Sequence, residues 1–414
     1  MNYIDLFAGA GGLSEGFIRK GFKPVAHVEL DQAACNTLKT RLSYHYLKSR
    51  KKSEVYHSYL KGEITRSDLY AHVPSELLDS VINLPIGPLH NETIFGKISN
   101  QLKNQNVDLI IGGPPCQAYS LVGRARSGDG MKKDPRNHLY VEYARYLEKY
   151  NPKLFIFENV LGLKSAKKGT YLINMEKLFL KKGFKIKLFT LEANNFGVLQ
   201  KRKRLIIIGW RNDLKLVLPD LEAIRSSLDF TVESVFSDLP KIFAGEGVDR
   251  YVSYRTIAND YLKQNSIRNG IDILTQHIAR PHTDQDKKIY RIAVGKWNKY
   301  GQRLDYNDLP DVLKTHKNRD SFFDRFKVVA QDLKYSQTVV AHIAKDGHYY
   351  IHPDIKQNRS ISVREAARLQ SFPDDYYFEG VKEKANRTAS FKQIGNAVPP
   401  LLAERIAKVI KDLF

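Results

Sequence analysis

Short apolar runs alternate with amphipathic stretches through the first half of the chain. Runs of about four to eight apolar residues predict buried strands, and apolar positions three or four residues apart predict helices. The predicted strands are Tyr3–Phe7, Pro24–Glu29, Val107–Ile111, Leu154–Phe157, Ile186–Leu191 and Leu205–Trp210. The predicted helices are Leu13–Lys20, Gln32–Leu42, Tyr140–Lys149 and Leu172–Lys182. This alternation predicts an α/β fold with a doubly wound, mostly parallel sheet and helices on both faces.

Two stretches break the alternation. Residues 44 to about 89 are basic, lack a strand period and are interpreted as an insertion. Residues from about 212 to 334 are polar, aromatic and basic with weak periodicity, which predicts a separate module. Beyond it we expect regular structure at Gln337–Ala341. An amphipathic helix is expected in Pro399–Phe414, where proline occupies the first turn.

The charge of the chain favours a polyanionic partner. Its 414 residues include 66 Lys and Arg against 45 Asp and Glu, a formal net charge of +21. Each phosphate that such a surface neutralises releases a counterion, which favours binding to nucleic acid. A lysine-rich surface that only keeps a protein soluble explains the excess equally well, so charge alone does not decide.

Cysteine content and hydropathy indicate the compartment. Two cysteines, Cys35 and Cys116, are too few for a disulfide framework and are typical of a reducing cytosol. The first residues lack the basic and apolar regions of a signal peptide. The longest apolar runs are strand-sized, far short of the ~20 residues that span a bilayer. We therefore expect a cytoplasmic protein without a membrane segment.

A glycine-rich segment follows the first predicted strand. Asp5–Leu13 (DLFAGAGGL) leaves the strand, turns on glycines and enters a helix, so backbone N–H groups can face a ligand. Glu29 ends the next strand, where a carboxylate can accept hydrogen bonds from ribose hydroxyls. The glycine spacing is not that of a G-x-G-x-x-G fingerprint, so a tight turn without a ligand remains an alternative.

Cys116 follows another predicted strand, within Gly112–Gln117 (GGPPCQ). Open α/β sheets keep their sites at the carboxyl ends of strands, and the prolines stiffen the approach to the thiol. A proline-rich turn with an incidental cysteine is the alternative. Cys35 differs, because in a helix beside Ala34 and Leu38 it is most simply a small core residue.

Two charged motifs come next. Glu158 ends an apolar strand, where a carboxyl group should resist ionisation and could act as an acid. A helix cap is the alternative interpretation. Arg202 and Arg204 lie two residues apart, on one face of an extended segment. They could fix a carboxylate, a phosphate or a base carbonyl, although a solvated charge run explains them equally well.

Together, and in this order, these motifs resemble those of the bacterial cytosine-5 DNA methyltransferases. Two later segments complete the set, Arg359–Pro373 (RSISVREAARLQSFP) and Gln393–Pro400 (QIGNAVPP). The resemblance implies a Rossmann-like methyltransferase domain in residues 1–211. It implies a smaller domain in residues 212–384 that contains the polar module for target recognition. Residues 385–414 would return to the catalytic domain.

The resemblance also implies the chemistry. A cytosine in a specific double-stranded DNA sequence would be flipped out of the helix and methylated at C5 by S-adenosylmethionine. Cys116 would attack C6, while Glu158 would hold N3 and the amino group with the help of Arg204. Enzymes that methylate exocyclic nitrogens have an aromatic residue in place of this cysteine, which separates the two reactions.

The resemblance assigns residues in three groups. The catalytic group is Cys116, Glu158, Arg202 and Arg204. The cofactor group is Phe7, Ala8, Gly9, Gly11, Gly12, Leu13, Glu29, Pro114, Leu139, Asn396 and Ala397. The DNA-binding group is Gln117, Ser120 and Arg136. To these we add Arg250 and Arg280 of the recognition module, because arginine can read guanine in the major groove, although for any single arginine of the module a solvated or core role is the more common one. The family usually has an acidic residue near the adenine where this chain has Ile82–Ile86, so that contact stays unassigned.

The expected partners are double-stranded DNA and, functionally, a restriction endonuclease; we expect a monomer. No metal is expected, because His277, His282 and Asp284 have no cysteine near them. An RNA cytosine-5 methyltransferase would share the chemistry, but the transfer-RNA enzymes on this fold carry a cysteine motif that the polar module lacks. A DNA-binding regulator on this fold should have lost Cys116 or Glu158, and both are present.

Overall fold

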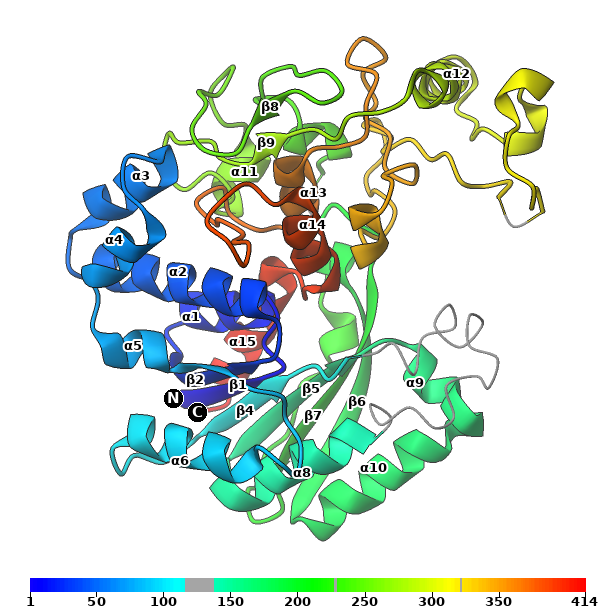
Figure 1. Ribbon diagram of the computed structural model, residues 1–414. Coiled ribbons are helices and arrows are strands. Elements are labelled where there is room, and N and C mark those ends of the chain that lie inside the picture. The colour runs from blue at the N-terminus through cyan, green and yellow to red at the C-terminus, as the bar shows by residue number, and fades with distance from the viewer. Residues whose placement is uncertain (116–137, 227–228, 321) are drawn as a thin grey trace.

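The computed structural model describes residues 1–115, 138–226, 229–320 and 322–414 (Figure 1). The described residues build a seven-stranded sheet in the order β3-β2-β1-β4-β5-β7-β6. Its strands are β1 (Asn2–Leu6), β2 (Lys23–Glu29), β3 (Val81–Asn83), β4 (Leu109–Gly112), β5 (Leu154–Asn159), β6 (Phe184–Glu192) and β7 (Lys203–Arg211). β1 to β5 run parallel, whereas β7 is antiparallel to both neighbours. The predicted mostly parallel sheet is confirmed.

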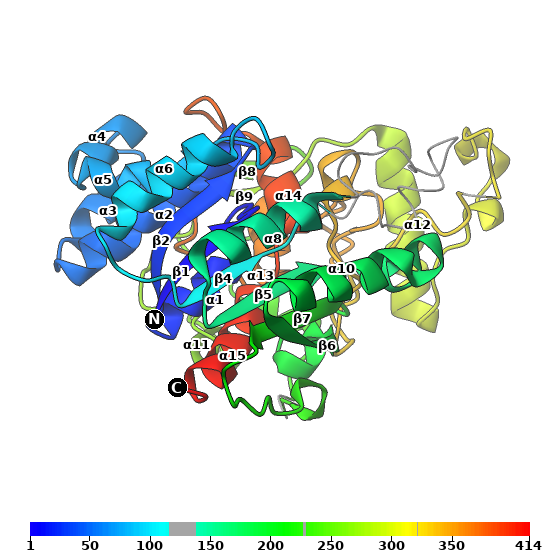
Figure 2. The same ribbon diagram turned by 90° about the horizontal axis from the view of Figure 1, so that it is seen from below.

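Helices cover both faces of this sheet (Figures 1 and 2). One face packs against α1 (Gly12–Arg19), α2 (Gln32–Ser49) and α15 (Pro400–Lys411), the other against α6 (Asn91–Leu102), α8 (Leu139–Tyr150) and α10 (Thr170–Lys181). In β5, Leu154 and Ile156 face the α1–α15 side, while Phe155 and Phe157 face α8 and α10. Successive residues of a strand point to opposite faces, so a sheet covered on both faces needs continuous apolar runs. The sequence shows such apolar runs at the predicted strands.

The segment interpreted as an insertion contains regular structure that the sequence did not reveal. Its first residues continue α2 to Ser49, and near its end β3 pairs in parallel with β2. Between them lie α3 (Ser53–Lys61), α4 (Arg66–Ala71) and α5 (Ser75–Asp79). Tyr44 and Leu47 pack in one cluster with Tyr56 and Tyr59, so apolar burial extends α2 beyond its predicted end. A strand as short as β3 shows no period in a sequence.

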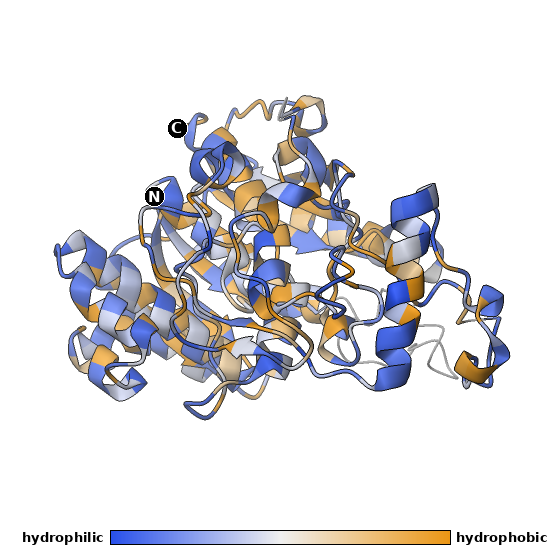
Figure 3. Ribbon diagram, turned by 90° about the horizontal axis from the view of Figure 1, so that it is seen from above, coloured by the Kyte–Doolittle hydropathy of each residue, from blue (hydrophilic) through white to orange (hydrophobic). Residues whose placement is uncertain are grey.

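The smaller domain has two separate cores. The larger part, here called the body, comprises residues 229–282 and 328–398. Its elements are α11 (Asp260–Gln264), α13 (Val363–Leu369), α14 (Arg387–Asn396), β8 (Gly247–Val248) and β9 (His277–Ile278). The α12 lobe, residues 283–327, contains α12 (Asp284–Tyr300) and a core that includes Tyr290, Tyr306 and Phe326. Figures 1 and 3 show this lobe standing apart from the sheet.

The prediction of regular structure at Gln337–Ala341 is wrong. Residues 337–340 form neither helix nor strand, and a short 3-10 helix, Ala341–Ala344, follows. Side chains from the catalytic domain hold this backbone instead. Arg202 donates to the Val339 carbonyl at 2.7 Å, and the Gln200 side chain accepts from the Val339 N–H at 2.9 Å. Residues 337–340 therefore form a contact with the catalytic domain and not a helix or strand of their own.

Buried clusters extend across the two predicted domain boundaries. Leu218 and Leu221 belong to the core beneath α1 and α15, so packing against the sheet continues past Arg211. At the other end, α14 packs into the body through Phe391 and Ile394, and α15 is the element that returns to the sheet.

A short helix, α9 (Gly162–Ser165), follows β5. Among the described helices, none has both the length and the apolar character needed to cross a bilayer.

Candidate active site

The chain leaves β1 through a turn that keeps its backbone accessible. Phe7, Gly9 and Gly11 have positive φ angles of 58°, 55° and 80°, a region that favours glycine. A Cβ on Gly9 would meet no atom within 4 Å. The turn leads directly into α1, whose first N–H groups have no partner within the helix. This place therefore suits a ligand that approaches the backbone closely.

Glu29, at the end of β2, closes one side of the turn. Its carboxylate accepts hydrogen bonds from the N–H groups of Gly9 and Asp31, both at 2.8 Å. Burial raises the pKa of Glu29, and these N–H groups oppose part of that shift. Asn83 lies opposite Glu29 in the β2–β3 register, and its Nδ2 donates to the carbonyls of Glu29 and Leu30. Asn83 is not among the predicted site residues, because a strand as short as β3 leaves no pairing pattern in the sequence.

Asp5 adds a second carboxyl group near the turn. It is buried in β1, and its Oδ2 accepts no hydrogen bond from the described residues. Burial, and to a smaller extent the Glu29 carboxylate, raises the pKa of Asp5 well above its usual value. A buried oxygen without a donor is costly, so a ligand that supplies one would be favoured here.

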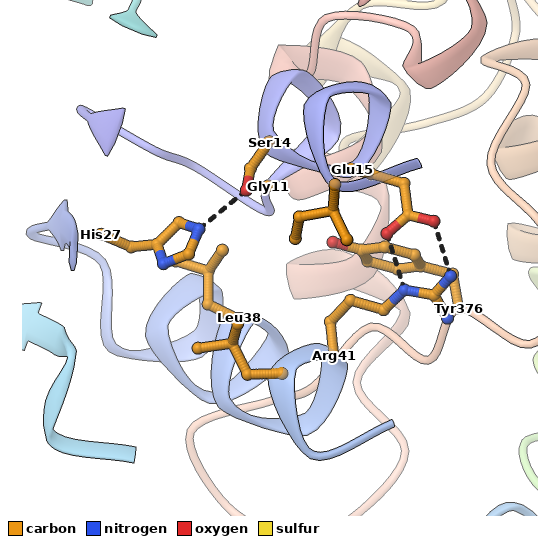
Figure 4. A pocket seen from close by; sticks show the side chains of 9 residues that line it. Gly11, Ser14, Glu15, His27, Leu38, Arg41 and Tyr376 are labelled. Carbon is orange, nitrogen blue, oxygen red and sulfur yellow. Dashed lines mark hydrogen bonds and ion pairs between the residues drawn. The ribbon is translucent and has the colours of Figure 1, made fainter. Parts of the chain in front are cut away.

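A chain of ion pairs and hydrogen bonds behind the turn fixes its position (Figure 4). Glu15 of α1 pairs with Arg41 of α2 at 2.6 Å, and Arg41 pairs with Asp375 of the body at 2.9 Å. Burial alone would raise the pKa of Glu15, but Arg41 holds it well below its usual value. Tyr376 then donates to the carbonyl of Ala10 within the turn. The glycine turn is thus anchored to the smaller domain.

The residues after α14 lie against the same turn. A Cβ on Gly12 would come within 2.3 Å of the Val398 carbonyl oxygen and 3.2 Å of the Ala397 Cβ. Asn396, which ends α14, is exposed, and Leu139 is half-buried in the first turn of α8. The structure therefore brings Ala397 to the predicted cofactor residues of the turn.

The carboxyl ends of β4 and β5 meet the start of β7 at the predicted acid. Glu158 Oε1 lies 2.7 Å from Arg204 Nε, and the two side chains are only 14% and 13% exposed. A Cβ on Gly113 would lie 2.6 Å from Glu158 Oε2, so glycine leaves the room that this carboxylate needs. Asn159 donates through Nδ2 to the Pro114 carbonyl at 3.3 Å. β5 therefore holds both the carboxylate and the chain that leads to residue 116.

Four of the predicted site residues, Cys116, Gln117, Ser120 and Arg136, lie outside the described residues, which stop at Pro115 and resume at His138. The structure describes the chain that leads to them as far as Pro115. Pro114 is buried and Pro115 is exposed, and both follow Gly113, where an added Cβ would meet the Glu158 carboxylate.

Comparison with known proteins identifies the family. Residues 1–65 and 83–412 match the model of the C-5 cytosine-specific DNA methylases. The chain belongs to this family. The methylase is therefore an enzyme that acts on carbon 5 of cytosine in DNA. Residues 66–82, between the two matched stretches, cover α4, α5 and the start of β3. This unmatched stretch is shorter than the predicted insertion.

Relatives cover the methylase from end to end. The Type II methyltransferase M.Bpa9945I of Bacillus paralicheniformis is 43% identical over 100% of this chain and 99% of its own. M.DdeI of Desulfomicrobium norvegicum is 33% identical over 100% of this chain and 89% of its own. A solved structure described as a DNA modification methyltransferase of an E. coli prophage superposes with a TM-score of 0.66 at 24% identity, covering 100% of this chain and 99% of that one. The last likeness shows a shared fold.

Arg202 of the methylase does not share the surroundings of Arg204. It is 1% exposed, and its guanidinium donates to the carbonyls of Val339, Gly395 and Ala397 at 2.7 to 3.2 Å. Although the two arginines are only two residues apart, Arg202 precedes β7 and enters the contact between domains. The sequence could not separate them, because the partners of Arg202 lie far along the chain.

The two arginines that were predicted to bind DNA, Arg250 and Arg280, are also engaged inside the methylase. Arg250 donates to the Tyr59 carbonyl at 3.0 Å, and its guanidinium lies 4.5 and 4.4 Å from the ring centres of Tyr59 and Tyr377. Arg280 donates to the carbonyls of Ile343 and Ala344 at 2.9 and 3.0 Å. Both guanidinium groups therefore contribute to packing between segments of the protein.

Proposed function

We propose that this methylase transfers a methyl group from S-adenosylmethionine to C5 of a cytosine within a specific double-stranded DNA sequence, with Cys116 as the covalent nucleophile. The pair of Glu158 and Arg204 carries the proposal. It holds a carboxyl group at the end of β5, beside the strand β4 whose continuation leads to Cys116. An acid and a nucleophile are the two groups that methylation of C5 requires.

The chemistry follows from the weakness of cytosine C5 as a nucleophile. The Cys116 thiolate bonds to C6, and the electrons of the C5=C6 bond shift toward N3, which Glu158 protonates or hydrogen-bonds. C5 of the resulting enamine would take the methyl group as the sulfur–methyl bond of the donor breaks with its electrons left on sulfur, which gives a neutral thioether, and N3 would then return any proton that it took from Glu158. Loss of the C5 proton then restores the C5=C6 bond and expels the thiolate. Arg204 occupies Oε1 of Glu158, so Oε2 is the oxygen available to the base.

The residues of the glycine turn fit S-adenosylmethionine. Open space at Gly9 admits a ligand beside the backbone, Glu29 can accept from ribose hydroxyls, and Asp5 Oδ2 can accept from an ammonium group. When bound, S-adenosylmethionine supplies an electrophilic methyl group. We assign the adenine contact to Asn83, because its Nδ2 is engaged and its Oδ1 can accept from the adenine amino group. The remaining cofactor contacts are assigned to Phe7, Ala8, Gly11, Gly12, Leu13, Pro114, Leu139, Asn396 and Ala397.

The remaining assignments concern partners and domains. We assign catalysis to residues 1–223 together with α15, and we assign target recognition to the smaller domain. Arg202 becomes a positioning residue that joins them. Gln117, Ser120 and Arg136 are assigned to the DNA. We propose that the methylase acts as a cytoplasmic monomer. The full-length likeness to Type II methyltransferases supports a role in protecting DNA from a cognate restriction endonuclease.

Cys116→Ser tests the proposal, because it removes the thiol while the DNA-binding surface stays intact. Methyl transfer to host DNA is read by sequencing that reports 5-methylcytosine, and affinity is read by gel shift on a duplex containing the methylated site. We expect loss of methylation with retained binding. With 5-fluorocytosine at the target, the unaltered enzyme should stay covalently attached, since fluorine does not leave as a proton does. Substantial methylation by the serine variant would remove Cys116 from its role.

A further inference from the structure

The arginines in the body's part of the predicted recognition module are engaged within the protein. Besides Arg250 and Arg280, Arg255 donates to the Ser237 carbonyl at 2.6 Å and Arg268 pairs with Asp238 at 3.0 Å. A guanidinium that is held by carbonyls or carboxylates has few donors left for a base edge. These four arginines therefore have little capacity left for direct reading of DNA sequence.

The α12 lobe presents a loop that is fixed at its base. The N–H of His316 donates to the Tyr306 hydroxyl at 2.9 Å, and the His316 ring stacks on Phe322 with centres 3.9 Å apart. Gln285 of α12 donates to the Thr315 hydroxyl at 2.9 Å. Tyr306 and Phe322 belong to the core of the lobe. This base is therefore ordered before any ligand arrives, which lowers the entropic cost of binding.

The residues beyond that base are exposed and basic. Lys317 and Arg319 form no hydrogen bond or ion pair within the described part of the chain, and both side chains are exposed. Asn318 and Asp320 beside them are also exposed. Figure 1 shows the lobe on the same side of the molecule as α9. α9 follows β5, the strand that carries Glu158, so the lobe and the proposed cytosine site face the same side of the molecule.

We propose that residues 315–320, the recognition tip, read base edges of the target sequence, with Arg319 and Lys317 as specificity-determining residues. The inference rests on the proposed function and deepens it. An arginine donates two hydrogen bonds to O6 and N7 of guanine, and each such pair is worth ~1–3 kcal/mol of discrimination. A loop with a fixed base and free donors has the form that this reading requires.

The outward face of α12 offers a matched control. Lys288 and Arg291 are exposed, form no hydrogen bond or ion pair among the described residues and lie one helical turn apart. Figure 3 shows the helix as largely hydrophilic. The double variants Lys317→Ala/Arg319→Ala and Lys288→Ala/Arg291→Ala each remove one lysine and one arginine from the lobe. They therefore differ in the surface that is changed and not in the charge that is lost.

The experiment first reads the target sequence from 5-methylcytosine in DNA of a host that expresses the unaltered enzyme. Methylation rates are then compared on that site and on single-base substitutions of it, for both double variants. We expect the tip variant to lose tenfold or more of the discrimination at one or more positions. The α12 variant should weaken methylation of all sites alike and keep discrimination within twofold.

Arg319→Lys separates reading from charge, because it keeps the charge and loses the two-donor geometry. It should lose discrimination at the same position as the double variant, with unfolding temperatures of all variants near that of the parent. Retained discrimination in the tip variants, or its loss in the α12 variant, would overturn the inference. Failure of the proposed function shows separately, as absence of 5-methylcytosine with the unaltered enzyme.

Discussion

The body and the α12 lobe both carry many arginines and lysines, but the body holds completely buried arginines, whereas the lobe also leaves arginines exposed to solvent. In the body, Arg359, Arg364 and Arg368 are completely buried, and Arg368 pairs with Asp238 at 2.5 Å and Asp374 at 2.6 Å. In the lobe, Arg319 is exposed to solvent. Burying a guanidinium costs several kcal/mol unless carboxylates or carbonyls replace its water. The number of cations in a segment therefore says less about DNA binding than the number left without an internal partner.

The largest effect is expected from breaking the buried network of the body. Asp238 pairs with both Arg368 and Arg268, so Asp238→Ala removes one of the two carboxylates that neutralise the completely buried Arg368. We expect a loss of about 3–5 kcal/mol in the free energy of unfolding, measured by urea denaturation. The control in the lobe is Asp311→Ala, whose exposed carboxylate lies 2.8 Å from the ammonium group of Lys314. That variant should lose far less stability, because water already solvates the Asp311 carboxylate. Equal losses in the two variants would abolish the contrast between body and lobe.

A second test uses the two arginines at the start of β7. Arg204→Ala removes the partner of Glu158 and should lower single-turnover methylation by ~10²-fold or more while unfolding stays nearly unchanged. Arg202→Ala instead leaves three carbonyls at the contact between domains without this donor, at ~1–3 kcal/mol for each that stays unsatisfied. Its main effect should be a lower unfolding temperature. Activity loss without destabilisation in Arg202→Ala would return that residue to the catalytic group.

The catalytic domain could be predicted from the sequence because its signals are local. A strand such as Leu154–Phe157 is an unbroken apolar run, and a glycine turn or a strand-end carboxylate is visible within a few residues. The pairing of Glu158 with Arg204 followed from the family resemblance, and the structure places them 2.7 Å apart. The role of Arg202 and the end of α2 could not be read, because both depend on partners distant in sequence.

The smaller domain resisted prediction for the same physical reason. Its body is held by ion pairs and side-chain hydrogen bonds to backbone, such as Arg368 with Asp238, which leave no periodic pattern. Polar residues that serve as a buried core look, in the sequence, like residues of a DNA-binding surface. Arg250 and Arg280 were assigned to DNA on this appearance, and the structure shows them in contact with the protein itself.

A smaller effect is expected from pH. Burial lowers the pKa of His277, in the body, to about 4, so the folded protein keeps this ring neutral. The unfolded chain takes up a proton near pH ~6.5. Below that pH only the unfolded state gains the proton, so stability falls between pH ~6.5 and 4. His277→Gln should reduce the loss of stability between pH 7 and 5 by ~2 kcal/mol, as measured by urea denaturation at both values.

His282 extends this test to the root of the lobe, because burial also lowers its pKa to about 4. If body and lobe unfold in one transition, His282→Gln should reduce the pH dependence of that same transition. A separate transition that alone responds to His282→Gln would mean that the lobe unfolds independently of the body. An unchanged pH dependence in His277→Gln would contradict the assignment of a neutral buried ring.

The smallest effect is expected from Arg250, and it examines the contrast most directly. This arginine lies between the rings of Tyr59 and Tyr377 and donates to the Tyr59 carbonyl. Arg250→Met keeps an unbranched side chain but loses the cation–π contacts and the hydrogen bond, so we expect ~1–2 kcal/mol of lost stability. The methylated sequence should not change, because the guanidinium faces protein. Arg319→Met in the recognition tip should do the reverse, with unchanged stability and altered sequence preference. Urea denaturation and 5-methylcytosine sequencing of the two variants measure both properties. A change of sequence preference in Arg250→Met would show that an arginine engaged within the body still reads DNA. The rule that arginines without internal partners mark the DNA-binding surface would then be wrong.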